Sequence, residues 1–152
     1  MENNQSQKVT PFLCYNGRLD EALDFYTSVF KNVKVLNARH LPGGKMMTAT
    51  FEIEGQRLMA LDAGPMFKFS EAISLFISCE TQEEVDDLWE KLSADGEKSR
   101  CGWLKDKFGV SWQVIPTALG RLLGSPDAAK AGRVLQGMMK MDKIIIKDLE
   151  EA

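Results

Sequence analysis

The sequence predicts an α+β fold of paired βαβββ modules that form a curved mixed sheet with helices outside, followed by C-terminal helices. The main observation is an internal repeat, in which the apolar residues of two helical segments lie 63 positions apart. Strand signals flank each helical segment. Two such units bury their sheets better side by side than separately. We therefore expect one domain, with modules at about residues 9–64 and 72–116 and a helical extension at about 117–152.

The first module begins with the apolar run Phe12–Tyr15, and Asn16-Gly17 marks the entry to a helix. The apolar residues of that helix follow the i, i+3, i+4, i+7 spacing: Ala22, Phe25, Tyr26 and Val29. Strand signals then occur in three segments: residues 33–39, 45–53 and 57–62. The turn-like pair Glu54-Gly55 joins the last two segments.

The second module repeats this order from the apolar run at residues 75–78, matched to Phe12–Tyr15 at the same offset. Its helix has the same apolar spacing: Val85, Leu88, Trp89 and Leu92. Thr81 and Glu84 predict a capping box at the start, and Asp95-Gly96 marks the end. A strand is expected at residues 110–115, and the repeat alone suggests one or two short strands within 97–107. The alternative is two unrelated strand–helix units that share only amphipathicity.

The C-terminal extension is predicted to be helical from Ser125, with Ser125 as N-cap and Pro126 at the first helical position. The apolar residues that follow keep helical spacing: Ala131, Val134, Leu135 and Met138. A face rich in methionine is expected to cover the domain or a second subunit, and a Met-rich binding groove is the alternative.

Composition excludes several classes of function. The chain of 152 residues has 19 basic and 22 acidic residues, so no basic field exists for nucleic acid. No apolar run is long enough to cross a membrane. The opening residues 1–8 are polar and resemble neither a signal peptide nor a lipidation motif. We therefore expect a cytoplasmic protein without a nucleic-acid or membrane partner.

The cysteines and the histidine limit the possible chemistry further. Cys14, Cys79 and Cys101 are odd in number and far apart, which favours neither a disulfide framework nor a zinc site. They are expected to be small buried hydrophobic residues. His40 is the single histidine, so a mechanism that needs two imidazoles within one protomer is excluded. We expect His40 to be exposed at the end of a strand.

Residues 101–116 form the densest cluster of candidate site residues, with two of the three tryptophans, a thiol and a Lys-Asp pair. On a strand, Gln113 shares one face with its neighbours two positions away, whereas Trp112 lies on the other. A concave sheet lined by aromatic residues and a few polar groups is a common way to build a small-molecule pocket. Alternatively, Trp103 and Trp112 belong to the core, and Lys105 and Asp106 form an ordinary turn.

Three segments together resemble the PhnB-like branch of the vicinal oxygen chelate superfamily, which includes glyoxalase I, bleomycin-resistance proteins and extradiol dioxygenases. They are TPFLCYNGRLDEALDFYTSVF, GPMFKFSEAISLFISCETQEEVDDLWEKLSADG and CGWLKDKFGVSWQVIP. The resemblance runs from about Val9 to the C-terminus, and it implies paired βαβββ modules. The branch is often labelled a demethylubiquinone 3-methyltransferase domain, which implies S-adenosylmethionine chemistry. The sequence, however, has no Gly-rich turn between a strand and a helix for that cofactor.

The resemblance also implies divalent-metal ligands on the first strand of each module and on the last strand. The matching positions are Pro11, Ile73 or Ser74, and Gln113, with a further histidine position at Thr48. Gln113 alone among these has a usual ligand side chain, and one ligand cannot hold a metal. We therefore expect neither a metal nor another cofactor.

The resemblance, the missing metal ligands and the aromatic cluster together imply a metal-free, homodimeric protein of the glyoxalase/bleomycin resistance fold that binds a small molecule. The expected cavity is lined by Thr48, Asp62, Phe67, Cys101, Trp103 and Gln113. One alternative is a metal-independent enzyme, including a methyltransferase, with Cys101 as nucleophile or with Lys105, Asp106 or Asp62 in acid–base roles. The other is a structural subunit whose C-terminal helices bind another protein.

Overall fold

The computed structural model describes residues 7–152, so most of the polar opening segment lies outside the described residues. The chain divides into two compact units, of which the first ends at Lys68 and the second begins at Phe69. Each predicted βαβββ module lies within one unit, and each unit is described by itself. That the two sheets pair into one domain stays a prediction. Within residues 7–152, no helix is long and apolar enough to cross a membrane.

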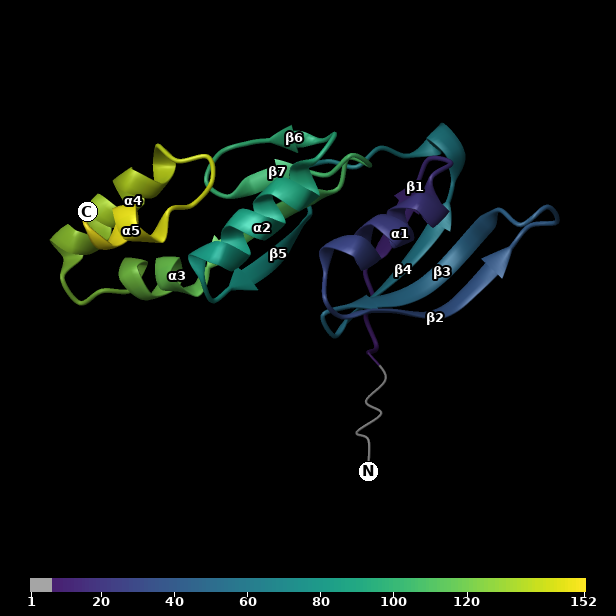
Figure 1. Ribbon diagram of the computed structural model, residues 1–152, viewed down its shortest axis with the longest axis horizontal. Coiled ribbons are helices and arrows are strands. Elements are labelled where there is room, and N and C mark those ends of the chain that lie inside the picture. Colours follow the sequence, from purple (N-terminus) through teal and green to yellow (C-terminus); the bar gives the residue numbers. More distant parts are fainter. Residues whose placement is uncertain (1–6) are drawn as a thin grey trace, which may run out of the picture. The chain divides into compact units, whose positions relative to one another are not determined.

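The first unit is a four-stranded mixed sheet with one helix (Figure 1). Its elements are β1 (Phe12–Tyr15), α1 (Leu19–Val29), β2 (Val33–His40), β3 (Met46–Ile53), β4 (Gln56–Asp62) and the short 3-10 helix η1 (Gly64–Met66). The strand order is β1-β4-β3-β2, with β1 parallel to β4 and the other pairs antiparallel. The predicted α+β module is therefore confirmed in this half.

Alternating residues of the first sheet form its core against α1. Leu13 and Tyr15 of β1 are buried, as are Phe51 of β3 and Leu58 of β4. The hydroxyls of Tyr15 on β1 and Tyr26 on α1 form a hydrogen bond of 2.9 Å. Each buried hydroxyl therefore has a hydrogen-bond partner. The opposite face of this sheet carries the intervening residues.

The second unit repeats the module and adds three helices. Its elements are β5 (Ser74–Cys79), α2 (Gln82–Ser93), β6 (Glu97–Lys98), β7 (Trp103–Lys105), β8 (Ser111–Pro116), α3 (Thr117–Leu123), α4 (Ala128–Met139) and α5 (Ile146–Glu150). The strand order β5-β8-β7-β6 matches that of the first sheet, with β5 parallel to β8. The two short strands suggested by the repeat are β6 and β7.

The repeat offset of 63 residues holds for the helices but not for the strands. Tyr26 and Trp89, both buried against their sheets, are 63 positions apart. Tyr15 pairs with the last residue of β4, and Cys79 pairs with the last residue of β8. Tyr15 and Cys79 are therefore equivalent positions of the two sheets, and they lie 64 residues apart. The connection from β1 to α1 is one residue longer than that from β5 to α2. The predicted match of Phe12–Tyr15 to residues 75–78 was therefore wrong by one residue, which would exchange the two faces of the strand.

The helix caps differ in detail from those predicted. The Thr81 hydroxyl accepts the Glu84 N–H at 3.1 Å as expected, but the Glu84 carboxylate accepts the N–H of Glu80 at 2.9 Å. Asp127, not Ser125, caps α4, because its carboxylate accepts the N–H groups of Ala129 and Lys130. The Ser125 hydroxyl instead accepts the Asp127 N–H at 3.2 Å, which fixes the turn before the cap. Pro126 therefore precedes the cap.

The C-terminal helices share a core with the end of β8. This cluster consists of Ile115, Leu119, Val134, Ile144 and Leu149. Met138 and Met141 pack against it, whereas Met139 is 58% exposed. The methionine-rich segment therefore covers the second unit through two of its three members, as one of the sequence alternatives expects.

Candidate ligand-binding site

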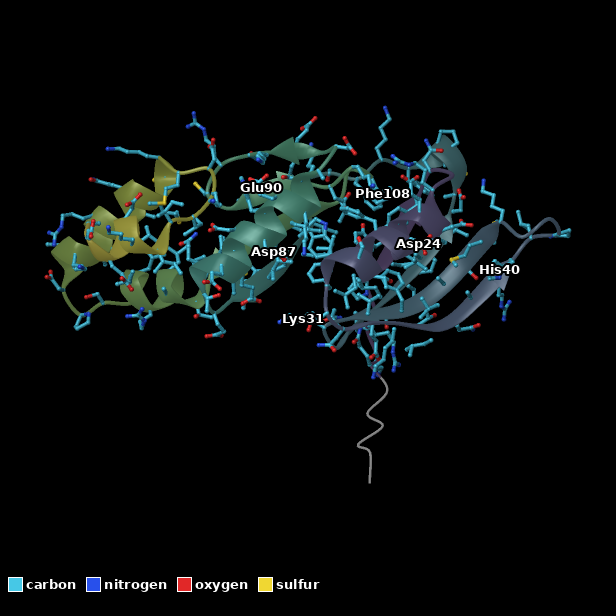
Figure 2. The ribbon with its side chains drawn as sticks, viewed as in Figure 1. Asp24, Lys31, His40, Asp87, Glu90 and Phe108 are labelled. Atoms are coloured by element: carbon cyan, nitrogen blue, oxygen red, sulfur yellow. The ribbon has the colours of Figure 1, made fainter. Side chains whose placement is uncertain are left out.

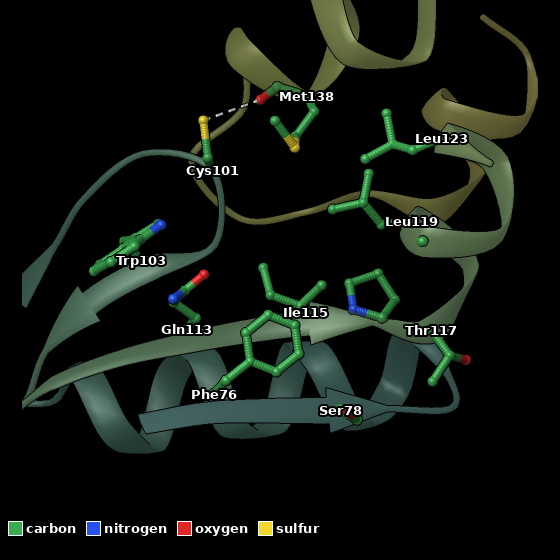
Figure 3. A pocket seen from close by; sticks show the side chains of 12 residues that line it. Phe76, Ser78, Cys101, Trp103, Gln113, Ile115, Thr117, Leu119, Leu123 and Met138 are labelled. Carbon is green, nitrogen blue, oxygen red and sulfur yellow. Dashed lines mark hydrogen bonds between the residues drawn. The ribbon is translucent and has the colours of Figure 1, made fainter. Parts of the chain in front are cut away.

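The second unit contains a pocket of about 490 Å³ between one face of its sheet and the helices α3 and α4 (Figure 3). The sheet face is the one opposite α2, which lies on the other side of β5 and β8 in the same view. The lining residues are Phe76, Ser78, Cys101, Trp103, Gln113, Ile115, Pro116, Thr117, Leu119, Gly120, Leu123 and Met138. This volume lies in the range of small-molecule sites in proteins, which is roughly 300–1,000 Å³.

A row of three side chains across β5, β8 and β7 forms the floor of the pocket. Phe76 and Trp103 are both register partners of Gln113, so the three lie side by side on one face. The alternation of the strand sends Trp112 to the opposite face, where it is 3% exposed. Both interpretations of the tryptophans therefore hold, since Trp103 lines the pocket and Trp112 belongs to the core.

The amide of Gln113 is held in one orientation. Its Nε2 donates a hydrogen bond to Oγ of Ser74, at the start of β5, over 2.9 Å. Figure 3 shows the amide oxygen of Gln113 and the indole nitrogen of Trp103 turned toward the pocket. In the part of the chain that the structure describes, neither of these two atoms has a hydrogen-bond partner. The floor thus offers one acceptor and one donor.

The remaining walls are mostly apolar, and Ser78 is the polar lining residue for which the described part of the chain shows no side-chain hydrogen bond. The Cys101 thiol donates to the carbonyl oxygen of Met138 at 3.6 Å, and this contact joins the sheet side to α4 (Figure 3). The Thr117 hydroxyl lies 3.4 Å from the carboxylate of Glu80, to which it donates. Among the described residues that line the pocket, none is charged.

The structure brings together three of the six site residues predicted from sequence. Cys101, Trp103 and Gln113 line the pocket, whereas Thr48, Asp62 and Phe67 belong to the first unit. Their participation in a shared cavity stays a prediction. Sequence reasoning missed the apolar partners Phe76, Ile115, Leu119, Leu123 and Met138. Strand alternation from Gln113 points to Ile115, but the helical residues come from segments with no local signal for the site.

Asp62 connects two loops of the first unit. Its Oδ1 accepts the N–H of Gly17 at 2.8 Å and that of Gly64 at 3.2 Å, and Lys45 Nζ lies 3.3 Å from Oδ2. Burial alone would raise the pKa of this carboxyl, but the two N–H donors and Lys45 together hold the pKa below its usual value. The carboxylate is thus engaged structurally and stays ionised.

Neither residue of the Lys105-Asp106 pair lines the pocket: Lys105 is the last residue of β7, and Asp106 begins the β7–β8 turn. Asp106 is 2% exposed and accepts the N–H groups of Phe108 and Val110 and the indole N–H of Trp112. Lys105 forms an ion pair with Glu71, which raises the pKa of the lysine. These contacts favour the ordinary-turn interpretation for Asp106, whereas Lys105 belongs to the strand before the turn.

The cysteines lie in three different environments. Cys79 is fully buried, and burial, with nearby Glu84 and Glu80, raises the pKa of its thiol to about 12. Such a thiol stays protonated and unreactive at neutral pH. Cys14 is half-buried on β1, and Cys101 lines the pocket. The expectation of buried hydrophobic cysteines is therefore met fully at Cys79 alone.

The positions that the superfamily resemblance assigns to metal ligands do not fit a divalent cation. Within the second unit, Gln113 and Ser74 are hydrogen-bonded to one another, and Ile73 has no donor atom in its side chain. Within residues 7–152, no group of three or more His, Cys, Asp or Glu side chains is placed so that it could hold a metal ion. His40 is exposed at the end of β2, as predicted (Figure 2). One amide oxygen and one hydroxyl do not form a divalent-metal site.

The pocket does not fit S-adenosylmethionine either. That cofactor carries a sulfonium, an ammonium and a carboxylate group. None of the described lining residues is charged, so these groups would be buried without partners. Unpaired burial of charge is strongly unfavourable.

Comparisons with known proteins identify relatives. Residues 7–115 match the family described as 3-demethylubiquinone-9 3-methyltransferase. A solved PhnB protein from Bacillus cereus is 36% identical, with a TM-score of 0.68, over 73% of this chain and 100% of that chain. Protein PA1353 from Pseudomonas aeruginosa is 21% identical, with a TM-score of 0.59, over 73% and 98% of the two chains. The fosfomycin resistance protein FosX from Listeria monocytogenes is 16% identical, with a TM-score of 0.60, over 80% and 99%. No curated protein matches.

The likeness to PA1353 and FosX supports the fold, because identities this low carry no more than that. The family match and the Bacillus cereus protein go further, since they span most of this chain at substantial identity. Both agree with the resemblance found in the sequence. This chain belongs to the PhnB-like family described as 3-demethylubiquinone-9 3-methyltransferase.

Proposed function

We propose that this chain binds an uncharged, largely apolar small molecule in the pocket of its second unit, without a metal. The observation that carries the proposal is the pocket itself, with about 490 Å³ of space and aromatic and aliphatic walls. Burial of a ligand against such walls supplies most of its binding free energy, and a few polar groups fix its orientation. The absence of charge among the described lining residues favours a neutral ligand.

Binding is favoured over a metal-independent enzyme because the candidate reactive groups are engaged elsewhere. Asp106 is hydrogen-bonded within the β7–β8 turn, and Lys105 forms an ion pair with Glu71. Asp62 is hydrogen-bonded to two loops of the first unit. Cys101 is a thiol in the pocket, but none of the described lining residues can act as a general base near it. The same absence of charged groups disfavours methyl transfer from S-adenosylmethionine in this pocket.

We also propose that the protein is a cytoplasmic homodimer. In the described part of each sheet, β1 and β5 have a strand partner on one side and are edge strands. Edge strands with free backbone groups are common sites of pairing with another chain. Phe12 on β1 and Phe76 on β5 are 50% and 59% exposed, which adds apolar surface at both edges. Light scattering coupled to size exclusion tests the dimer, and a monomeric mass at micromolar concentration would contradict it.

A pocket-filling substitution at Gly120 tests the binding proposal. Gly120 lines the pocket within α3, and a Cβ built there meets no atom within 4 Å. Gly120→Leu should therefore fill the pocket without strain, and it also replaces a glycine inside a helix, which favours folding by roughly 0.5–1 kcal/mol. The probe is Nile red, an uncharged dye whose emission rises in apolar surroundings.

We expect the wild-type protein to bind Nile red and Gly120→Leu to lose about tenfold or more in affinity. Gly132→Leu is the matched control, because Gly132 lies in α4 with the same open space around its Cβ but outside the pocket lining. Far-ultraviolet circular dichroism verifies that both variants fold. Equal dye binding by the wild type and Gly120→Leu would refute the pocket as the binding site.

A further inference from the structure

We infer that the ligand is a neutral phenol, whose hydroxyl is recognised by Gln113 and Trp103 on the pocket floor. The inference rests on the proposed binding function and goes beyond it by naming the chemical class of the ligand. It depends on three features of the floor: a fixed acceptor, a neighbouring donor and apolar walls around both.

The acceptor is fixed because Gln113 uses its amide nitrogen elsewhere. Nε2 donates to Ser74 Oγ at 2.9 Å, so the amide oxygen is the atom left for a ligand. Figure 3 shows this oxygen on the pocket side. A ligand that places an acceptor against it, such as a carbonyl or ether oxygen, would leave two oxygens facing one another without a proton. A hydrogen-bond donor on the ligand is therefore required at this point.

The donor lies next to the acceptor on the neighbouring strand. Trp103 is the register partner of Gln113 across β7 and β8, and an indole N–H can donate but not accept. In residues 7–152, no hydrogen bond of this N–H is found, and Figure 3 shows the indole nitrogen facing the pocket. A ligand hydroxyl can donate to Gln113 and accept from Trp103 with one atom.

The apolar residues around Gln113 and Trp103 favour a ligand whose hydroxyl is attached to an uncharged aromatic ring. Phe76 continues the floor on the other side of Gln113, and Ile115 follows on β8. Leu119 and Met138 face them from α3 and α4. A flat ring can pack between these walls, whereas an anion would meet the Gln113 oxygen and no cationic side chain among the described lining residues. An uncharged phenol satisfies all three features together.

Four naphthalene probes separate these requirements. 2-Naphthol has the donor, 2-methoxynaphthalene has an acceptor alone, naphthalene has neither, and 2-naphthoate is an anion. Binding is followed by NMR through the indole N–H signals of Trp89, Trp103 and Trp112, with the Trp103 signal assigned from Trp103→Phe. We expect 2-naphthol to shift the Trp103 signal and to bind about tenfold more tightly than 2-methoxynaphthalene and naphthalene. 2-Naphthoate should bind most weakly.

Gln113→Met removes the acceptor and keeps a side chain of similar length. In this variant the preference for 2-naphthol over 2-methoxynaphthalene should fall from about tenfold to about twofold or less. Thr117→Val is the matched control, because Thr117 lines the pocket but directs its hydroxyl to Glu80, so the preference should be retained. Trp103→Phe should weaken both probes together, since the hydroxyl and the ether both accept a hydrogen bond.

The outcomes distinguish this inference from the proposed function. Equal affinity of the wild type for 2-naphthol, 2-methoxynaphthalene and naphthalene would overturn the phenol assignment and leave the apolar pocket as a binding site. A tenfold preference that persists in Gln113→Met would also overturn it. If none of the probes binds and Nile red also fails to bind, the proposed function falls as well.

Discussion

The two units of this protein have the same strand order and the same helix position in the chain. They differ in the length of the first two strands that follow the helix. In the first unit, β2 and β3 are eight residues long each and form a full hairpin. In the second, the equivalent strands β6 and β7 have two and three residues. Three helices follow the second module and pack over part of its sheet, and the pocket lies there. The pocket thus occurs in the unit that combines a short hairpin with an added helical segment.

The hairpin of the second unit is short because Cys101 and Gly102, both with positive φ, form the centre of the tight turn that joins its strands. This turn bonds to the C-terminal segment. The N–H of Cys101 donates to the carbonyl oxygen of Met141 at 2.9 Å, and that of Gly102 donates to Asp142 at 2.7 Å. The central residues of a two-residue hairpin turn lie outside the ladder between β6 and β7, so these N–H groups are available to another segment. The segment between α4 and α5 accepts both of them. The helices are therefore fixed to the module by its own backbone.

The aromatic residues also divide between the units, which provides separate reporters. Both tyrosines, Tyr15 and Tyr26, lie in the first unit, and all three tryptophans lie in the second. Tryptophan fluorescence therefore follows the unfolding of the second unit alone. Hydrogen exchange measured by mass spectrometry reports on peptides of either unit.

The largest expected effect is that of Gly102→Ala in the second unit. Gly102 has φ of 83°, and a Cβ there would lie 2.7 Å from Ile115 Cδ1 and 2.8 Å from the Val114 carbonyl oxygen. The backbone strain and the steric overlap should together cost about 3 kcal/mol of unfolding free energy. Urea unfolding followed by tryptophan fluorescence measures the loss.

Gly55→Ala separates the strain from the overlap. Gly55 has nearly the same φ of 85°, in the turn between β3 and β4, but its Cβ would meet no atom within 4 Å. We expect Gly55→Ala to cost about 1 kcal/mol of unfolding free energy. The loss should be seen only in the hydrogen exchange of peptides from the first unit. Equal costs for the two variants would show that the overlap with Ile115 and Val114 adds nothing to the backbone strain at Gly102.

The second prediction concerns Asp62 and the acid stability of the first unit. Asp62→Asn retains the shape of the side chain but removes the charge that strengthens the contacts with Gly17, Gly64 and Lys45. We expect a loss of about 1–2 kcal/mol at pH 7. Urea unfolding followed by far-ultraviolet circular dichroism between pH 3 and pH 7 measures it.

The pH dependence follows from the lowered pKa of Asp62. Its contribution is fully present above the pKa of the unfolded chain, about 3.9, and is lost as the pH falls through the lower folded pKa. The difference between wild type and Asp62→Asn should thus be constant above about pH 5 and shrink below pH 4. Asp24→Asn, on the outward side of α1, is the control and should show no such trend (Figure 2). A constant difference down to pH 3 would refute the structural role of the charge.

Most of the fold could be predicted because its signals are local. The predicted strand at residues 33–39 corresponds to Val33–His40, and that at 57–62 corresponds to Gln56–Asp62. Glu54 and Gly55 both have positive φ, as a tight hairpin turn requires. The slip in strand register arose because helical spacing fixes the helices but says nothing about the length of the loop before them.

The site could be predicted in part only, because its other half depends on contacts distant in sequence. Trp103 and Gln113 were found because both lie in the short cluster of residues 101–116. The helical wall was not, since the bond between Gly102 and Asp142 joins positions far apart in the chain. Asp62 was a polar residue at a strand end, and no pattern distinguished a ligand-binding carboxylate from one that clamps two glycine N–H groups.

The smallest effect concerns the start of the two equivalent helices. α2 begins at a Thr81 cap whose hydroxyl accepts the Glu84 N–H, whereas α1 begins at Arg18 without a side-chain cap. Thr81→Ala should cost about 1 kcal/mol of unfolding free energy in the second unit. Arg18→Ala loses an exposed ion pair with Glu21 and should cost less than about 0.5 kcal/mol. Tryptophan fluorescence measures the first loss and hydrogen exchange of α1 the second. Equal costs would mean that the two helices start with equal stability despite their different caps, and that the burial of their apolar faces alone determines where they begin.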